Sequence, residues 1–374
     1  MAESFSLKDQ LINADKVRLL AGWLAPVVPG FDADQFQRDV MARLLELELK
    51  ARISWIAEVM ARHLPDDFET SAALIHQALP PALDPTLTDD DFGDFIIDPF
   101  GQYVASHGLD RLDLSPPLLH ALTQRFSMEF AIRPFLIEHK DHMFDVLMGW
   151  ARDENYHVRR LASEGSRPLV PWGERIRWAV ADTIPILDQL YADKTRYVTR
   201  SVANHLNDIA KSDPDLVVST LRRWQKEGRQ DTKEMAWMTR HACRTLVKQG
   251  HAGALELLGF RADAKVSIGP IAITPTDGKV AIDTKLEFAF DVTAERDEAL
   301  IIDYVIQFQR SGGKLSEKVF KIKQADLKAG QTLRITKAHL FKGNATTFRL
   351  YPGAHQLTVQ INGRAMGQVG FELV

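Results

Sequence analysis

The feature that most limits how this chain can fold is an aromatic-x-x-arginine pattern that recurs at a near-constant interval. The three copies are Tyr156 with Arg159, Tyr197 with Arg200, and Trp237 with Arg240. Their arginines are 41 and then 40 residues apart. A period of about 40 residues is typical of HEAT-type repeats, in which each helix pair buries its apolar face against the next pair. The spacing therefore predicts a HEAT-like α-helical repeat solenoid.

The hydrophobic pattern of residues 1–260 agrees with this prediction. Amphipathic stretches with few helix breakers predict helices over 36–63, 170–191, 215–224 and 232–248. The stretch 79–100 differs because it is rich in proline and aspartate, and it contains three consecutive aspartates at 89–91. We expect it to be a long, solvated acidic loop.

The texture of the sequence changes near residue 262. All seven tryptophans precede residue 240, whereas the segments 266–268, 285–290, 304–309 and 356–361 alternate apolar and polar residues fully or in part. Turn signals containing glycine separate these segments. About seven strands in roughly 110 residues predict an immunoglobulin-like β-sandwich. The chain is thus expected to be multidomain, α then β, with a repeat domain over 1–261 and a sandwich over 262–374.

The composition is that of a globular protein, with 45% hydrophobic and 26% charged residues, which excludes wholesale disorder. No run of apolar residues approaches the roughly 18 that a membrane span needs, and the N-terminus lacks the pattern of a secretory signal. The single cysteine, Cys243, cannot form an internal disulfide. These observations predict a cytoplasmic protein without a membrane partner, and we expect a monomer.

The net charge of −4 conceals an uneven distribution. Residues 1–120 hold 9 basic and 20 acidic residues, residues 121–260 hold 21 and 18, and residues 261–374 hold 16 and 12. The last two thirds of the chain are therefore able to bind a polyanion if their basic residues share a face.

Alignment of the repeats on their arginines reveals a polar face at the offsets i, i+3, i+4 and i+7. The second helix contributes Ser201, Asn204, His205 and Asp208, the third contributes His241, Arg244, Thr245 and Lys248, and the first contributes Arg160, Ser163, Glu164 and Arg167. The repeat arginines precede this face by one residue and are expected to brace neighbouring repeats. Every amphipathic helix has a solvated face, but the abundance of Asn, His, Arg and Ser favours a binding surface.

Other motifs point to no cofactor. The sequence contains no glycine-rich phosphate loop, HExxH motif or GxSxG motif. His139 and His142 would share a helix face, but two ligands do not make a zinc site. We therefore expect neither a metal nor an organic cofactor.

Three segments of the helical region resemble the AlkC branch of the AlkC/AlkD family of DNA glycosylases. They are Ser127–Leu136, His157–Pro168 and Arg200–Lys211. The resemblance covers roughly residues 1–260, and the predicted β domain matches the bacterial subgroup that carries a C-terminal immunoglobulin-like domain. One departure is His205, since a tryptophan occupies the corresponding place in the AlkD branch.

This resemblance implies a fold that cradles duplex DNA and excises cationic N3-alkylated bases, 3-methyladenine and 3-methylcytosine, without flipping the base into a deep pocket. It also implies that Glu129, Glu164 and Asp208 are the catalytic carboxylates and that Trp172 is an aromatic wall. Their alternatives are structural: an ion pair of Glu129 with Arg133, a pair of Glu164 with Arg160 or Arg167, and core packing of Trp172.

The chemistry is consistent with those residue types. N3-alkylation makes the base a cationic leaving group, so bond cleavage builds positive charge on the deoxyribose, which carboxylates stabilise while they orient a water molecule. An indole face adds cation–π attraction of about 0.5–2 kcal/mol. A non-catalytic repeat scaffold that binds DNA or an acidic protein remains the alternative function.

Basic residues of both regions are the expected DNA contacts. In the repeats these join polar residues of the shared face, and in the β domain we expect basic side chains near turns to contact phosphates while the domain closes over the DNA. The alternative for the β domain is a module that serves solubility or stability. The predicted contacts are Arg160, Arg167, Asn204, His205, His241, Arg244, Lys248, Lys314, Lys318, Lys342 and Arg364.

Overall fold

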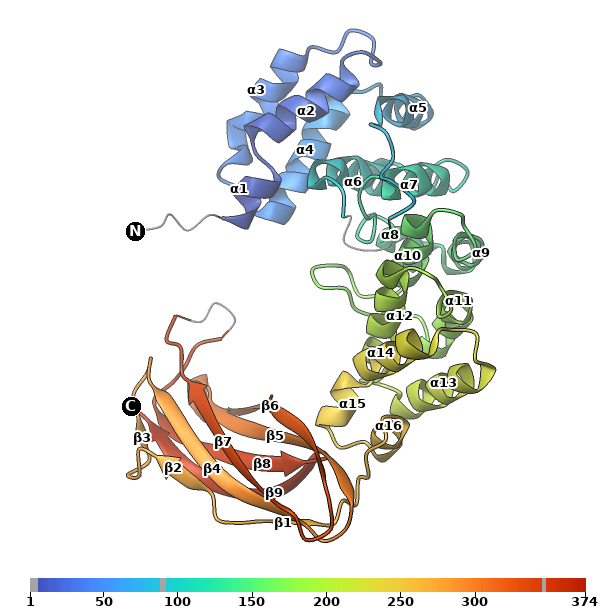
Figure 1. The fold of residues 1–374 in the computed structure, drawn as a ribbon. Coiled ribbons are helices and arrows are strands. Elements are labelled where there is room, and N and C mark those ends of the chain that lie inside the picture. The colour runs from blue at the N-terminus through green and yellow to red at the C-terminus, as the bar shows by residue number, and fades with distance from the viewer. Residues whose placement is uncertain (1–5, 88–91, 345–347) are drawn as a thin grey trace. The chain divides into compact units, whose positions relative to one another are not determined.

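Helices form the first two thirds of the chain and strands the last third, as the sequence predicts (Figure 1). The structure is a computed structural model that describes residues 6–87, 92–344 and 348–374. The helices are α1 (Leu7–Leu11), α2 (Ala14–Leu24), α3 (Ala33–Leu44), α4 (Leu49–His63), α5 (Phe68–Ala78), η1 (Phe95–Ile97), α6 (Asp98–His107), α7 (Ser115–Thr123), α8 (Arg133–Glu138), α9 (Lys140–Trp150), α10 (Tyr156–Gly165), η2 (Val180–Thr183), α11 (Ile184–Leu190), α12 (Arg196–Ile209), α13 (Pro214–Glu227), α14 (Thr232–Ala242), α15 (Arg244–Lys248) and α16 (Ala252–Leu257).

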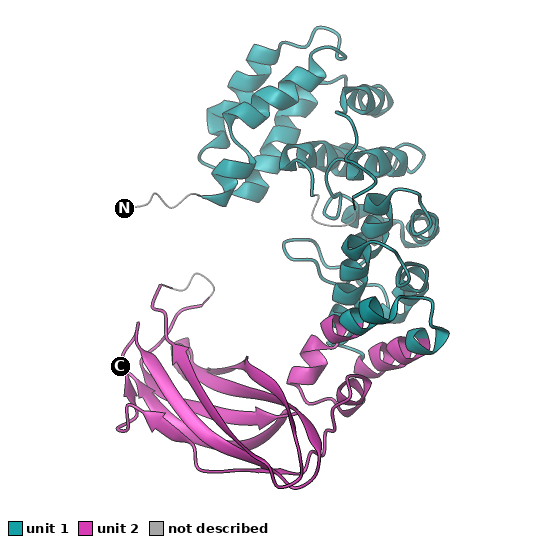
Figure 2. Cartoon of the chain, in the orientation of Figure 1, with its two compact units in different colours: residues 1–213, 224–238 teal, residues 214–223, 239–374 magenta. Residues whose placement is uncertain are grey.

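The chain divides into two compact units, which Figure 2 colours separately. Unit 1 comprises residues 1–213 and 224–238, and unit 2 comprises residues 214–223 and 239–374. The change from helix to strand falls between α16 and β1, at the place where the sequence texture changes. The domain boundary at residues 261/262 stays a prediction, because the compact units group the last helices with the strands.

Unit 1 is built from stacked helices whose apolar faces pack against one another. Helix α10 packs on α12, α4 on α6, and α2 on α3. The apolar stripe of α12, formed by Val202, Leu206 and Ile209, is completely buried. Arg159 binds Asp193 just before α12, with Nε 2.5 Å from Oδ2. This contact across successive repeats is the bracing expected of a repeat arginine.

Several predicted helices are shorter than expected. The stretch 36–63 is split into α3 and α4. At the break, the side chain of the buried Arg52 donates to the Leu47 carbonyl (Nε–O 3.0 Å). The stretch 232–248 breaks at Cys243, where Arg244 Nη1 donates to the His241 carbonyl at 2.6 Å. The helix predicted over 170–191 is wrong for its first half, since regular structure begins only with η2.

The predicted acidic loop over 79–100 is only partly correct. Its last residues form η1 and the start of α6, and Ile96, Ile97 and Phe100 are buried in the core. Only glycine fits at position 93, because an added Cβ would lie 1.8 Å from the Arg125 carbonyl oxygen. The three aspartates 89–91 lie outside the described residues.

Two facing sheets form the sandwich of unit 2. The strands are β1 (Val266–Ile268), β2 (Ala272–Thr274), β3 (Lys279–Val280), β4 (Lys285–Ala294), β5 (Glu298–Gln309), β6 (Leu315–Leu327), β7 (Thr332–Leu340), β8 (Gly353–Ile361) and β9 (Arg364–Leu373). One sheet has the order β1-β4-β2 with β7 on the other side of β4, and the second has the order β3-β9-β8-β5-β6. Alternate side chains of β4, such as Phe288 and Phe290, fill the core between them.

Helices α15 and α16 are joined to the sandwich within unit 2. The Asn362 side chain donates to the Arg261 carbonyl at 2.8 Å and accepts from Ile301 N at 2.7 Å. Gly363 lies so close to Gly250, between the two helices, that an added Cβ would be 2.1 Å from the Gly250 Cα. The β8–β9 turn therefore packs directly on the helical end of this unit.

Candidate active site

The loop that follows α10 is held by a buried arginine. Arg133, at the start of α8, has no exposed surface and donates to the carbonyls of Gly165 (2.9 Å), Arg167 (3.0 Å) and Glu174. These bonds satisfy backbone carbonyls that would otherwise need another hydrogen-bond donor. The guanidinium of Arg133 is therefore occupied by these carbonyls. The alternative that paired Glu129 with Arg133 is wrong, because Glu129 binds Arg160 instead.

The same loop presents Trp172 to solvent. Its side chain is 61% exposed and its backbone has φ 67°, a conformation that only a strongly held segment imposes on a tryptophan. Lys50 of α4 donates to its carbonyl at 2.6 Å. Core packing, the structural alternative for this residue, is wrong. An exposed indole whose backbone is held in this way offers a surface for a ligand.

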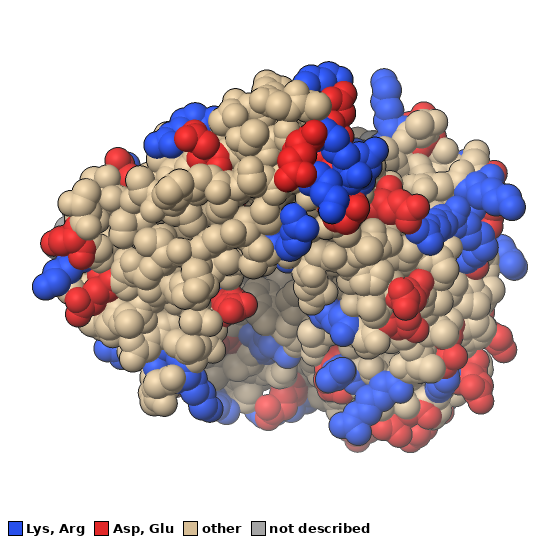
Figure 3. All heavy atoms as spheres, turned by 90° about the horizontal axis from the view of Figure 1, so that it is seen from below, with Lys and Arg blue, Asp and Glu red and all other residues tan. Residues whose placement is uncertain are grey.

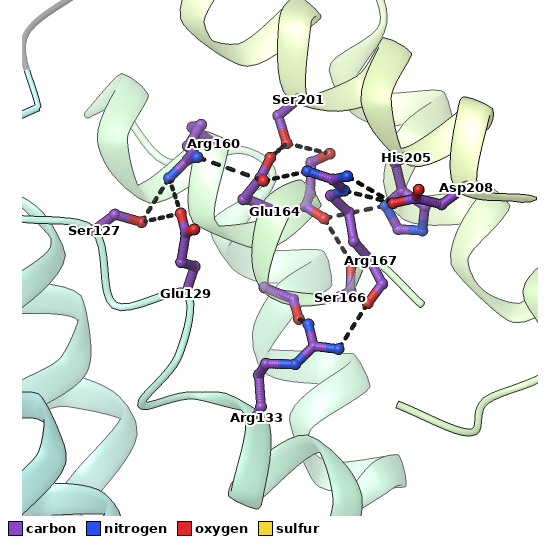
Figure 4. Close-up of polar contacts among 12 residues, drawn as sticks. Ser127, Glu129, Arg133, Arg160, Glu164, Ser166, Arg167, Ser201, His205 and Asp208 are labelled. Carbon is purple, nitrogen blue, oxygen red and sulfur yellow. Dashed lines mark hydrogen bonds and ion pairs between the residues drawn. The ribbon is translucent and has the colours of Figure 1, made fainter. Parts of the chain in front are cut away.

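Three carboxylates and two arginines alternate in one buried chain (Figure 4). Arg160 binds Glu129 (Nη1–Oε2 2.6 Å) and lies 3.6 Å from Glu164. Arg167 binds Glu164 (2.5 Å) and Asp208 (Nη2–Oδ2 2.7 Å). We name this series the carboxylate–arginine chain. The three carboxylates predicted as catalytic are thus brought together from three separate segments.

Burial and ion pairing compete within this chain. Burial by itself would raise the pKa of Glu164, but the positive charges of Arg160 and Arg167 outweigh it and hold that pKa below its usual value. Burial likewise opposes the charge of Arg160, yet Glu129 and Glu164 raise its pKa. Glu129 is the most accessible carboxylate, with 16% of its side chain exposed against 6% for Glu164 and Asp208.

The residues that the first two repeats contribute to the predicted polar face are mostly buried, where α10 packs on α12. Ser201 Oγ donates to Glu164 Oε2 at 2.6 Å and lies 2.9 Å from Ser163 Oγ. His205 is completely buried, its Nδ1 lies 3.1 Å from the Ser163 carbonyl, and burial lowers its pKa to about 4. The prediction that His205 lies on the DNA-binding surface is wrong, because its side chain has no exposed surface. It is a neutral residue of the helix interface, because the two helices pack through their polar faces.

The other predicted contacts of the helical region differ in accessibility. Arg160 and Arg167 are largely buried in the carboxylate–arginine chain, which favours a role in orienting carboxylates; their contact with phosphates stays a prediction. Asn204, His241 and Arg244 are half-buried, and Lys248 is exposed.

The basic residues predicted for the sandwich are exposed but do not gather at one place. Lys314 follows β5 and Lys342 follows β7, so the strand pairing puts both at one end of the sandwich. Lys318 lies near that end, 4.8 Å from the Phe348 ring. Arg364 begins β9 at the opposite end, where it donates to the Ala264 carbonyl at 2.9 Å. On the face drawn in Figure 3, basic and acidic side chains are interspersed rather than separated.

Two residues that shape this site, Arg133 and Asp98, were not among the predicted site residues. Arg133 organises the Trp172 loop, and its only sequence signal is that it belongs to the segment resembling the family. Asp98, the first residue of α6, is 3% exposed and borders a cleft that Trp172 and Phe130 also line. It was grouped with the solvated aspartates around it, although the apolar Ile96, Ile97 and Phe100 beside it predict burial.

Over residues 6–87, 92–344 and 348–374, no group of three or more His, Cys, Asp or Glu side chains is placed to hold a metal ion. Within the same ranges, no helix has the length and apolar character needed to cross a membrane.

Comparison with known proteins agrees with this architecture. The family model described as "DNA alkylation repair enzyme" matches residues 126–246, which hold the carboxylate–arginine chain, and the model of the C-terminal Ig-like domain of YhaZ matches residues 271–374. The uncharacterized protein YhaZ of Bacillus subtilis is 32% identical over 97% of this chain and 98% of its own. The alkylpurine DNA glycosylase AlkC of Pseudomonas fluorescens, solved with DNA that contains an abasic-site analogue, is 35% identical, with a TM-score of 0.86 over 99% of this chain and all of its own. The chain therefore belongs to the DNA alkylation repair enzyme family, in the group that carries a C-terminal Ig-like domain.

Proposed function

We propose that this protein is a monofunctional DNA glycosylase that hydrolyses the N-glycosidic bond of cationic N3-alkylated bases in duplex DNA. The observation that carries the proposal is the carboxylate–arginine chain beside an exposed tryptophan. A scaffold that only bound DNA would gain nothing from three carboxylates close to phosphates. The likeness over the whole chain to AlkC, a glycosylase solved on DNA with an abasic-site analogue, supports the same reaction.

The reaction proceeds by loss of the base and addition of water. The bond between the sugar C1′ and the base nitrogen breaks, and its electron pair leaves with the cationic base, which departs as a neutral molecule. No general acid is needed. Water adds to C1′ and gives up a proton, so the products are the free base and an abasic site.

Glu129 is proposed to face the positive charge that develops on the sugar. It is the most accessible of the three carboxylates, and Ser127 Oγ (3.0 Å) and Arg160 fix its orientation. Carboxylates held in this way stabilise a charge without reorganising during the reaction. Glu164 and Asp208 are more deeply buried and position the two arginines. Trp172 is proposed to lie against the cationic base or sugar.

The test is single-turnover release of base from methylated duplex DNA, with the released bases identified by chromatography. Glu129→Gln should slow release about tenfold or more, and Glu164→Gln and Asp208→Asn should also slow it. Glu138→Gln, at an exposed position of the same unit, is the matched control and should keep the parent rate. A monofunctional enzyme leaves the strand intact until alkali is added.

The outcomes separate the two candidate functions. Binding of DNA without release of any base would favour the non-catalytic scaffold. If all three carboxylate variants release base at the parent rate, the catalytic assignment is refuted. The same chromatogram reports the balance between 3-methyladenine and 3-methylcytosine.

A further inference from the structure

Asp98 is a buried carboxylate without a polar partner. It is 3% exposed, and in the described part of the chain the influences on its side chain are burial and the charges of Glu129 and Lys50, without a hydrogen bond. Buried carboxylates are normally hydrogen-bonded or paired, because an isolated buried charge is costly. Burial, reinforced by the negative charge of Glu129, raises the pKa of Asp98 to about 7, while Lys50 acts in the opposite direction.

The carboxylate borders a narrow cleft of unit 1. The aromatic walls of this cleft are Phe95, Phe130 and Trp172, and Lys50 lies at its edge. Phe130 directly follows Glu129, so the cleft lies next to the candidate active site. We name it the Asp98 cleft.

The size of the Asp98 cleft limits what it can hold. Its water-accessible volume is about 40 Å³. One water needs about 10–15 Å³ by this measure, whereas pockets for small molecules measure about 300–1,000 Å³. The cleft therefore has room for one to about three waters, and it is too small for a base. An unpartnered carboxylate supplies the acceptor that such a water requires.

We propose that the Asp98 cleft holds the water consumed in the reaction and that Asp98 accepts its proton. This inference rests on the proposed function. As the C1′–N bond breaks and the neutral base leaves, the water oxygen bonds to C1′ and its proton passes to an Asp98 oxygen, from which it is later released to solvent. Glu129 and Asp98 then divide the work, since one stabilises the sugar cation and the other takes the proton.

The charged groups around Asp98 define how this step depends on pH. Among the described residues, Glu129 from the segment before α8 and Lys50 from α4 are the groups whose charges act on it. The other elements packed on α6 direct their titratable groups elsewhere. Helix η1 has no titratable group, and His120 of α7 is paired with Asp153. On α5, Glu69 is paired with Arg111 and His76 is exposed.

The test is the pH profile of base release by the full chain. Single-turnover rates are measured on methylated duplex DNA from about pH 5.5 to about pH 9, after subtraction of spontaneous release. The parent rate should fall as pH drops through about 7, because the protonated acid cannot accept a proton. Asp98→Asn should be about tenfold slower or more at high pH and should lose this decline. A residue that only stabilises the helix start would not alter the shape of the profile.

Asp94→Asn is the matched control, because Asp94 is a neighbouring carboxylate that caps η1 and pairs with Lys16 without lining the cleft. It should keep the decline near pH 7. If Asp98→Asn retains the parent rate and profile, the inference is overturned while the proposed function stands. A parent chain that releases no base would overturn the proposed function instead, and the inference with it.

A second variant protects the test against misfolding of the first. Lys50→Met removes the positive charge that favours the ionised form of Asp98, so the decline in rate should move to higher pH. An unchanged midpoint in this variant would also overturn the inference.

Discussion

Replacing Arg160 with methionine tests whether the carboxylate–arginine chain is a structural unit. The arginine bonds Glu129 Oε2 and Ser127 Oγ, each at 2.6 Å, lies 3.6 Å from Glu164, and packs against the Tyr197 ring. Methionine keeps much of the apolar stem but removes the charge and every donor. Two buried carboxylates are then left with fewer partners.

The expected loss is large because the groups are shielded from water. Only 13% of the Arg160 side chain is exposed, together with 16% of Glu129 and 6% of Glu164. Breaking a buried pair by removing one partner costs about 3–5 kcal/mol. We expect Arg160→Met to reduce the free energy of unfolding of unit 1 by about 3 kcal/mol at pH 8.

The loss should shrink as the pH falls. Arg160 helps to hold the pKa of Glu164 below its usual value, so the pair contributes stability above the unfolded-state pKa of that group and loses it at lower pH. Without Arg160, Glu164 takes up a proton more readily. The gap between parent and variant should therefore be smaller at pH 5 than at pH 8.

Urea unfolding followed by tryptophan fluorescence measures this effect, since all seven tryptophans lie in unit 1. Arg18→Met is the matched control, because it breaks an exposed pair with Asp15 whose side chains are 66% and 84% exposed. Such a pair contributes about 1 kcal/mol or less. The reasoning is refuted if Arg160→Met lowers the free energy of unfolding no more than the control does. If the variant instead reduces the slope of log K against log salt for DNA binding by about one, Arg160 is a DNA contact rather than a structural bridge.

Three further predictions follow from single features. The stability difference between Asp98→Asn and the parent should shift in favour of the variant by about 2–3 kcal/mol from pH 5 to pH 8. The reason is that the raised pKa of Asp98 makes the folded parent lose stability as pH rises from about 4 to about 7. A difference in urea midpoint between variant and parent that is the same at both pH values would contradict this. Gly363→Ala should lower the melting temperature of unit 2, since its Cβ would lie 2.1 Å from the backbone between α15 and α16; an unchanged calorimetric transition would show that this contact is not needed. If the sandwich contacts DNA through the end that holds Lys314 and Lys342, changing both to Gln should weaken binding more than Arg364→Gln in a fluorescence titration, and equal effects would disfavour that end.

The sequence predicted the architecture because both of its signals are local. A repeat of about 40 residues and amphipathic periodicity indicate stacked helices, and alternation at period two indicates strands of a sandwich. The strands 266–268, 285–290, 304–309 and 356–361 all lie within β1, β4, β5 and β8. Side-chain periodicity depends on the backbone geometry of each element, so it can be read without knowledge of distant residues.

The sequence also identified the residues of the carboxylate–arginine chain, and the alternative that paired Glu164 with Arg160 or Arg167 is confirmed by both contacts. It did not predict the pairs between residues that are distant along the chain. Glu129 and Asp208 were predicted as catalytic, and Arg160 and Arg167 as phosphate contacts. The structure pairs Glu129 with Arg160, 31 residues away, and Asp208 with Arg167, 41 residues away. Such pairs depend on how successive helices stack.

What only the tertiary structure decided is where polar groups are buried. His205 has the sequence environment of a surface residue, yet it is completely buried and contacts the Ser163 carbonyl of α10. Arg133 lies close to Glu129 in sequence, yet its donors reach the carbonyls of a loop more than 30 residues later. Asp98 follows a run of acidic residues, yet it is enclosed beside Trp172. In each case the free energy of a polar group is set by neighbours that are distant along the chain, and no local pattern records them.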